Sequence, residues 1–431
     1  MDASGWTARR VGFRLTCALL LLGGVPLEQV WARVEINVID KLNDETIAAS
    51  WPVTQQNSLP RFGSTGPIRG KLCMTISLSG QISAGDAVRF RKAIDAEQQR
   101  LNPDNDLVSF DEAGKPERNL RCFDVARLSR EHQVPHNLLT LNSGGGNFKE
   151  AVQIAEIARE FNFTTVVPKG AKCLSACAIV FLNGTYRQNS WDLNPIPSRW
   201  MHVGAQVGLH APFPAYAGDM KFSTDEARSI YGTGAKQIVQ YFDMVRTAIV
   251  DNRVLDEILK ETSPDKFKYI NTIDEAVRWN IDLFGYKKPA ISEDDRGIFA
   301  ACANIWNRHL TKNAMEYEEP EVLRYAKSDL KGLQPMVSNR AFIEEGYAFY
   351  LNKTGPSNAP TYTAIVKVGG ARFNWEIRCR MEAAPAMRSA GLRTIVVESS
   401  TVPEVVTPLP LSKRIPIWFL FFGEATLSEV Q

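Results

Sequence analysis

A serine between two cysteines, in "GAKCLSACAIVFLNG" (residues 170–184), has the residue types and spacing that suggest catalysis. Ser175 follows a Lys-Gly-Ala-Lys turn and opens an apolar helical pattern, so its hydroxyl is expected at a helix N-terminus. Unpaired backbone N–H groups and the helix dipole favour negative charge there. A serine acts as a nucleophile when a base removes its proton and the developing oxyanion is stabilised. The alternative is a simple helix cap, the commonest use of a serine at this position.

A second turn of chemical interest is Gly144-Gly145-Gly146, which follows the strand-like segment "HNLLTLNS" (136–143) and precedes a helical pattern. Without side chains, these residues let backbone N–H groups approach a substrate carbonyl closely. The order strand, helix, strand, helix from residue 71 onward predicts βαβ units in a largely parallel sheet. Strand-to-helix turns of such units meet at the carboxyl edge of the sheet. The sequence therefore predicts that the glycine turn and Ser175 lie side by side.

The segments "LNSGGGNFKEAVQIAEIARE" and "TTVVPKGAKCLSACAIVFLNG" resemble the Clp-type serine proteases and their exported relatives in the ClpP/crotonase superfamily. The resemblance covers residues 71–287. It implies repeated βαβ units, Ser175 as nucleophile and an oxyanion hole formed by the amides of Gly146 and Ala176. It also implies that Gly144 and Gly145 line the substrate site. Proteins of this fold commonly form trimers or stacked rings, so a homo-oligomer is implied as well.

The same resemblance assigns a base and an acid downstream of the serine. His210 in "VGLHAPF" matches the family's base, and Asp265 in "SPDKFKYINTIDEAVRWNID" (263–282) matches its acid, with Asp274 as a nearby alternative. The chain order Ser, His, Asp is that of the family. The expected function is an exported serine hydrolase, peptidase-like, that acts on a peptide or another acyl compound without a metal or cofactor. One alternative is a non-catalytic scaffold or binding protein, and another is an acyl-CoA enzyme, against which export argues because CoA is cytoplasmic.

Other candidates for the chemistry are weaker. Lys172 suggests a Ser–Lys dyad but reads better as a solvated turn residue, and His202 reads as a surface or satisfied core histidine. His132 and His136 have no positional argument for catalysis. Cys173 and Cys177 are spaced to form a disulfide within one helical turn. In an exported protein, a structural disulfide is expected more than a nucleophilic role for either cysteine.

The N-terminus predicts export. Three arginines precede the apolar run "LTCALLLLGGVPL" (15–27), and "VWA" (30–32) supplies small residues at a cleavage site. Together they describe a cleaved, secretory signal peptide over residues 1–32, with an uncleaved membrane anchor as the alternative. The expected compartment is the periplasm. Of the seven cysteines, Cys17 leaves with the signal, and the others suggest disulfides, with Cys73–Cys122 and Cys302–Cys379 as the longer pairings.

Composition places the remaining chain among ordinary globular proteins, with 44% apolar and 23% charged residues and a formal net charge of +2. This charge gives no basis for a nucleic-acid partner, or for a membrane partner beyond the signal peptide. Residues 33–70 read as an arm or linker, 71–287 as the ClpP/crotonase-like domain and 288–431 as a small C-terminal α+β module. A helix is expected from Ser223, and the apolar run 415–422 reads as a strand. The expected buried side of that helix comprises Ala227, Ile230, Ile238, Phe242, Val245 and Ile249.

Overall fold

The architecture is taken from a computed structural model of the chain. The described residues are 35–38, 72–101, 136–186, 196–212, 222–248, 257–261, 266–287, 296–312, 346–354, 361–370, 373–382, 392–400, 406–409, 413–415, 417–421 and 423–431. The predicted signal peptide, residues 1–32, lies outside them, and so does Asp265.

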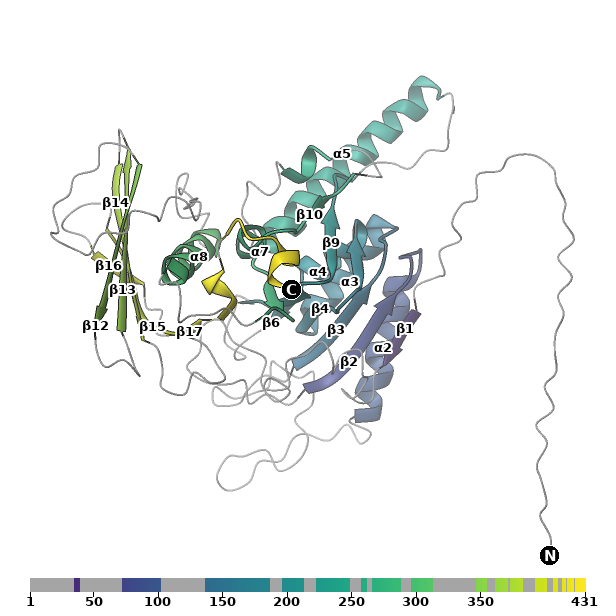
Figure 1. The fold of residues 1–431 in the computed structure, drawn as a ribbon. Coiled ribbons are helices and arrows are strands. Elements are labelled where there is room, and N and C mark those ends of the chain that lie inside the picture. The colour runs from purple at the N-terminus through teal and green to yellow at the C-terminus, as the bar shows by residue number, and fades with distance from the viewer. Residues whose placement is uncertain are drawn as a thin grey trace, which may run out of the picture. The chain divides into compact units, whose positions relative to one another are not determined.

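A six-stranded sheet with the order β1-β2-β3-β4-β8-β11 forms the centre of the α/β part (Figure 1). Its strands are β1 (Glu35–Val38), β2 (Leu72–Ser79), β3 (His136–Asn142), β4 (Phe163–Val167), β8 (Arg199–His202) and β11 (Asp282–Phe284). All neighbouring strands from β2 to β11 pair in parallel, and only the edge strand β1 is antiparallel. The largely parallel sheet predicted from the order of strands and helices is therefore confirmed.

The helices that follow these strands build the core around the sheet. They are α2 (Asp86–Leu101), α3 (Phe148–Glu160), α4 (Ala176–Leu182), α5 (Thr224–Thr247), α7 (Ile273–Arg278), α8 (Arg296–Lys312) and α9 (Leu427–Val430). α3 begins at Asn147, whose side chain accepts a hydrogen bond from the Glu150 N–H, and it buries three alanines against its neighbours. Every residue of α4 is buried, as expected for a helix that is apolar on all sides. The helix that follows Ser175 is thus a central core element.

A buried arginine fixes the carboxyl end of α4. Arg199 of β8 donates hydrogen bonds to the carbonyl oxygens of Leu182, Ala248 and Asn280. These carbonyls lie at or near the ends of α4, α5 and α7, where helix carbonyls lack partners within the helix. Burial lowers the pKa of Arg199 to about 9, with the charge of Arg308 adding to the effect and that of Asp282 opposing it. The side chain therefore ties three helix ends to the central sheet.

A second, three-stranded sheet carries the segment around Ser175. It has the order β10-β9-β5, and its strands are β5 (Lys172–Leu174), β9 (Gln206–Leu209) and β10 (Lys268–Tyr269). β5 pairs in parallel with β9, whereas β9 and β10 are antiparallel. The segment that leads to His210 is divided between the two sheets, since β8 ends at His202 and β9 begins at Gln206. Two further short strands, β6 (Thr185–Tyr186) and β7 (Ile196–Pro197), pair with each other.

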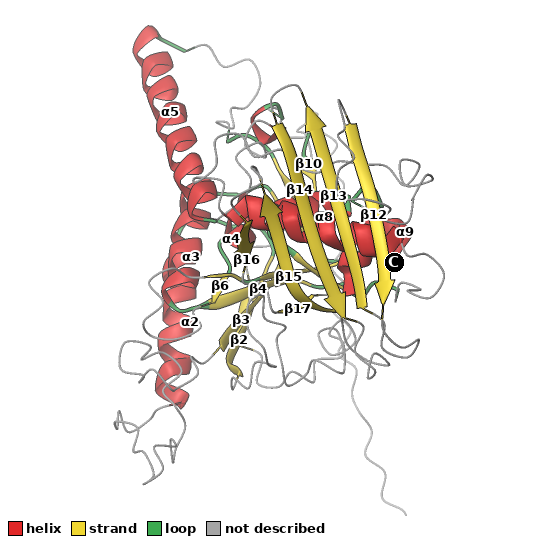
Figure 2. Ribbon diagram, turned by 90° about the vertical axis from the view of Figure 1, so that its left-hand side faces the viewer, coloured by secondary structure: helices red, strands yellow, loops and turns green. Residues whose placement is uncertain are grey.

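The C-terminal part contains a separate antiparallel sheet of six strands, whose long members lie side by side in Figure 2. They are β12 (Gly346–Thr354), β13 (Thr361–Gly370), β14 (Phe373–Glu382), β15 (Leu392–Ser400), β16 (Val406–Leu409) and β17 (Lys413–Ile415). β14 pairs with β13 on one side and with β15 on the other, both antiparallel. The apolar run 415–422 does not form the expected strand: Ile415 is the last residue of β17, and Ile417–Leu420 forms the 3₁₀ helix η4.

The last residues of the chain pack on the α/β part. The N–H of Ile273 donates to the Ala425 carbonyl at 3.0 Å, and the N–H of Leu427 donates to the Asn271 carbonyl at 2.8 Å. Trp418 and Phe419 of η4 are buried in the same core cluster as α8. Residues beyond 287 therefore contribute to the core of the α/β part as well as to the C-terminal sheet.

The apolar side of α5 differs from the expectation. Ala227, Ile238 and Phe242 are exposed and Ile230 is half-buried, whereas the side chain of Val245 and all of Ile249 lie outside the described set. The buried residues are instead Tyr241 and Met244 of the helix and Ala248 directly after it. Val239 and Tyr231 are also exposed, at 61% and 80% of their surface. Apolar residues at helical spacing mark a helix face that favours burial. The spacing does not show that other residues of the same chain pack against that face. Among the described residues, no helix is both long and apolar enough to cross a membrane.

Candidate active site

Ser175 occupies the sharp turn between β5 and α4, as the sequence predicts, and its backbone conformation is unusual. Its dihedral angles are φ 54° and ψ −125°. Among the described residues, the other non-glycine residues with positive φ are Asn162 and Asn280. Asparagine reaches positive φ readily, whereas serine seldom does. A residue held in so sparsely populated a region costs about 1–3 kcal/mol and is typical of active sites, where the surrounding structure enforces it.

The hydroxyl of Ser175 is not used as a helix cap. Ser175 is the N-cap residue of α4, yet its side chain makes no capping hydrogen bond. By contrast, the N-cap residues of α3 and α7, Asn147 and Thr272, both accept one from a backbone N–H. The side chain of Ser175 is half-buried. The sequence could not separate a cap from a nucleophile, and this geometry removes the capping explanation.

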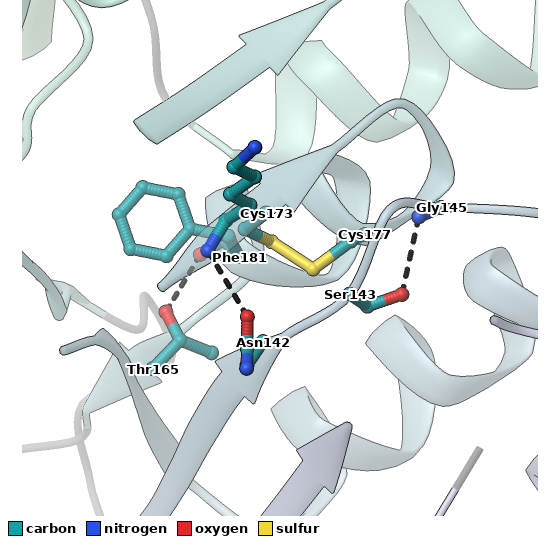
Figure 3. Close-up of a disulfide and its surroundings, with 8 residues drawn as sticks. Asn142, Ser143, Gly145, Thr165, Cys173, Cys177 and Phe181 are labelled. Atoms are coloured by element: carbon teal, nitrogen blue, oxygen red, sulfur yellow. Dashed lines mark hydrogen bonds between the residues drawn. A yellow bond between two sulfur atoms is a disulfide. The ribbon is translucent and has the colours of Figure 1, made fainter. Parts of the chain in front are cut away.

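The turn before α3 is tied directly to the turn that holds Ser175. Ser143 and Cys173 form a parallel bridge, in which the Ser143 N–H donates to the Lys172 carbonyl at 2.6 Å. The Leu174 N–H donates to the Ser143 carbonyl at 3.0 Å. Figure 3 shows Ser143 and Gly145 beside the Cys173–Cys177 disulfide. The predicted meeting of the two strand-to-helix turns is therefore found in the structure.

Gly145 makes the closest contact between the two turns. A Cβ atom added to it would lie 2.6 Å from both the Ser175 Cβ and the Leu174 carbonyl oxygen, and 3.1 Å from the Ala176 nitrogen. Gly145 is buried, its N–H donates to Ser143 Oγ at 3.1 Å and its carbonyl accepts from the Ile82 N–H at 2.8 Å. Its own polar groups are thus occupied, and what it provides is the close approach of the glycine turn to Ser175.

Two backbone N–H groups near Ser175, those of the exposed Gly146 and the buried Ala176, have no hydrogen-bond acceptor among the described residues. Gly146 is exposed and forms a parallel bridge with Ile82. The hydrogen bonds of this bridge are made by the neighbours of Gly146: the Ile82 N–H donates to the Gly145 carbonyl, and the Asn147 N–H donates to the Ile82 carbonyl. Within the described part of the chain, the N–H of Gly146 has no acceptor. The same holds there for the N–H of Ala176, which is the first residue of α4 and has no partner within the helix. Gly144, beside them, is exposed.

His210 lies at the end of β9, the strand that pairs with β5. The Ser175 N–H donates to the carbonyl of Gly208 at 2.8 Å, so the serine turn and the histidine strand are joined by a backbone hydrogen bond. The ring nitrogen Nδ1 of His210 lies 2.7 Å from the Ala211 carbonyl oxygen. Because a carbonyl only accepts, Nδ1 carries the proton and Nε2 carries the lone pair in the neutral ring. Burial lowers the pKa of His210, although the hydrogen bond to Ala211 opposes this. The ring is therefore in the form that a general base requires.

The structure describes two members of the predicted triad, Ser175 and His210. Within the described residues, no hydrogen bond links Ser175 Oγ to the His210 ring, and Asp265 lies outside those residues. Instead, the Phe267 ring contacts the His210 ring edge-on, with 5.0 Å between centroids. β10 begins at the next residue and pairs with β9. The segment that follows Asp265 in the sequence is thus held beside His210.

The other residues that the sequence offers for catalysis have different roles in the structure. Lys172 is exposed. His202 is buried, accepts a hydrogen bond at Nδ1 from the Gly204 N–H and contacts the Phe284 ring, so it is a satisfied core histidine. Cys173 and Cys177 form the predicted disulfide, with Cα atoms 5.1 Å apart. Cys302 is disulfide-bonded too, but its predicted partner Cys379 has a side chain outside the described set. No group of three or more His, Cys, Asp or Glu side chains is placed to hold a metal ion among the described residues.

Two contributors to this geometry are absent from the candidates that the sequence supplies. Ser143 supports the glycine turn through its hydroxyl and joins β5 through its backbone. Ala211 orients the His210 ring through its carbonyl, and its own N–H donates to the Glu261 carbonyl at 2.9 Å. Both residues act through hydrogen bonds within turns. In the sequence, a serine before three glycines is only a weak indication of such a role, and an alanine gives no indication at all.

The strain at Ser175 can be measured through stability. The Ser175→Gly variant is expected to be more stable than Ser175→Ala by about 1 kcal/mol, because glycine adopts positive φ without the Cβ penalty and alanine does not. Denaturant unfolding of the two variants measures the difference. If Ser175→Gly is instead the less stable of the two, the usual result for glycine at an ordinary position, the backbone of residue 175 is not strained.

Comparison with known proteins does not assign a family. No protein-family model matches the sequence, and no curated protein is significantly similar to it. The function must therefore be argued from the geometry described above.

Proposed function

We propose that this protein is an exported serine hydrolase of the ClpP/crotonase-like type, in which Ser175 attacks the carbonyl carbon of a peptide or another acyl substrate. One observation carries the proposal: a serine with φ 54° and ψ −125°, at a strand-to-helix turn, with a glycine turn packed against its Cβ. A strained serine between a strand and a helix is the arrangement of a nucleophile elbow, which exposes the hydroxyl and aligns backbone amides with it. The likeness to that elbow concerns local geometry and supports the chemistry independently of the sequence resemblance.

In the proposed reaction, His210 Nε2 takes the proton from Ser175 Oγ as the oxygen bonds to the carbonyl carbon. The carbonyl oxygen becomes an oxyanion, and the free N–H groups of Gly146 and Ala176 donate to it. His210 then gives the proton to the leaving group, and water repeats the sequence on the acyl-enzyme. Asp265 is the proposed acid that stabilises the imidazolium, in addition to the Ala211 carbonyl that holds Nδ1.

Export is part of the proposal and is supported by the cysteines. Cys173, Cys177 and Cys302 are all disulfide-bonded, and disulfides persist in oxidising compartments such as the periplasm. A periplasmic location removes CoA esters from the available substrates. Peptides and other acyl compounds remain as the proposed substrate class.

The second candidate function is a scaffold that keeps the fold without catalysis. It is favoured by one observation, the lack of a hydrogen bond between Ser175 Oγ and His210 within the described residues. Catalytic hydrogen bonds are often long in the absence of substrate and tighten when it binds, so a chemical test is needed to separate the two functions.

That test is covalent labelling of the folded protein by a fluorophosphonate, which reacts with activated serines. We expect one adduct, located on the peptide that contains Ser175 by mass spectrometry, and none on heat-denatured protein. A folded protein that forms no adduct, or forms it on another residue, contradicts the hydrolase proposal and leaves the scaffold as the better description.

The pH dependence of the labelling rate tests the role of His210. The neutral ring is the base, so the rate falls as pH drops through the pKa of His210. Since burial lowers that pKa below its ordinary value of 6.5, we expect the half-maximal rate below pH 6.5 and a plateau from there to about pH 8. Circular dichroism at each pH shows whether the protein stays folded. A midpoint above pH 6.5 in folded protein contradicts the prediction.

A further inference from the structure

The disulfide Cys173–Cys177 encloses the candidate nucleophile. Cys173 is the middle residue of β5, Cys177 is the second residue of α4, and Ser175 and Ala176 lie between them. Figure 3 shows the bond spanning from the strand to the helix. Both cysteines are fully buried. The covalent link therefore joins the two elements on either side of the strained turn.

The elements that flank Ser175 are short. β5 has three residues and α4 has seven, so although α4 is packed in the core, each element has few internal hydrogen bonds next to the turn. Among the described residues, three backbone hydrogen bonds hold the turn: the Leu174 N–H donates to the Ser143 carbonyl, the Ser175 N–H to the Gly208 carbonyl and the Ala178 N–H to the Ser175 carbonyl. None of them directly fixes the orientation of the Ala176 N–H. The disulfide restrains the residues on both sides of that amide.

We propose that the Cys173–Cys177 disulfide is a positioning device for catalysis, which holds the Ser175 backbone and the Ala176 N–H in the geometry that reaction requires. This inference rests on the proposed hydrolase function. Preorganised donors act because they need no rearrangement as charge develops. Loss of the bond would let the turn relax toward ordinary dihedral angles and rotate the amide away from the oxyanion. The oxidised form of the protein is then the active form.

The test removes the bond and keeps the packing. In the double variant Cys173→Val/Cys177→Ala, valine suits the buried strand position and alanine the helix. We expect the fluorophosphonate labelling rate of the folded variant to fall about a hundredfold, as for a misplacement of about 1 Å at a reacting group. Hydrogen exchange of the peptide spanning 170–182 is expected to speed up. The control is Cys302→Ala, which removes a disulfide from α8, and in which both readouts should stay as in the wild type.

A second measurement applies if the double variant does not fold. Folded wild-type protein is treated with dithiothreitol, which donates two electrons and two protons to the disulfide, is oxidised to its cyclic disulfide and leaves two thiols. Alkylation and mass spectrometry identify molecules in which Cys173 and Cys177 are reduced. The labelling rate of this fraction is expected to fall as in the variant, and Cys302→Ala protein treated in the same way shows whether the loss belongs to the Cys173–Cys177 bond.

The outcomes separate this inference from the proposed function. Labelling and local exchange that both match the wild type, in protein lacking the bond, overturn the inference while the hydrolase stands. A lower melting temperature with an unchanged labelling rate also overturns it, because the bond then serves stability alone. If the wild type itself forms no adduct, the proposed function fails. In that case, faster hydrogen exchange confined to residues 170–182 in protein lacking the disulfide would still show that the bond holds the turn. Hydrogen exchange equal to that of the wild type would show that it does not.

Discussion

Replacing Ser175 with alanine is expected to lower the fluorophosphonate labelling rate by at least about 10⁴-fold, because loss of the nucleophile alone removes almost the whole contribution of a catalytic triad. The stability of the protein should change by less than about 0.5 kcal/mol. The reason is that the Ser175 side chain makes no capping hydrogen bond, and alanine keeps the Cβ and therefore the same backbone strain. Labelling kinetics and denaturant unfolding measure the two effects.

A true cap in the same protein serves as the matched control. Thr272 Oγ1 accepts a hydrogen bond from the Glu275 N–H at 3.2 Å in a complete capping box. Thr272→Ala is expected to cost about 1 kcal/mol of stability and to leave the labelling rate near that of the wild type. If Ser175→Ala costs as much stability as Thr272→Ala and leaves labelling unchanged, Ser175 is only a cap.

The Gly145→Ala variant is expected to damage both the site and the fold. The new Cβ would lie 2.6 Å from the Ser175 Cβ and from the Leu174 carbonyl oxygen, and the backbone φ is +100°. Because the close neighbours include backbone, the two turns must separate, which we expect to cost about 2–5 kcal/mol from overpacking and positive φ together. The labelling rate should fall about 10²–10³-fold, as for the loss of one oxyanion donor. Unfolding curves and labelling of the folded fraction measure these effects.

Gly170→Ala provides the comparison for Gly145→Ala. Gly170 also has positive φ, +72°, but an added Cβ would meet no atom within 4 Å. Its replacement should therefore cost only the backbone penalty, about 1–2 kcal/mol, and should preserve labelling. Equal effects of the two variants would show that the glycine turn does not need its close contact with Ser175.

Much of the α/β part follows from local patterns in the sequence. The segment 136–143 is a short apolar run typical of a buried strand, and the apolar residues after Asn147 recur at helical spacing. Both elements form where the pattern places them. The same holds for the spacing of Cys173 and Cys177, which is short enough for a disulfide. The apolar run at 415–422 was predicted wrongly as a strand, because a short apolar segment has no period that separates it from a buried helical turn.

The α5 helix shows where such patterns stop being informative. Its position and its capping box at Ser223 and Glu226 were predictable, but Ile238 and Phe242 are exposed and Tyr241 is buried. Periodicity reports which side of a helix is apolar. Which residues are covered depends on the surfaces that meet, and these come from distant parts of the chain.

The sequence alone determined the order of strands and helices, the parallel sheet and the two strand-to-helix turns, because each depends on residues close together in the chain. Tertiary structure decided the positive φ of Ser175 and the close approach of Gly145. Those features arise where β5 meets Ser143 and β9, segments brought together only by folding. The dihedral angles of the Ser175 turn are set by such long-range contacts, and no local pattern of residues encodes them.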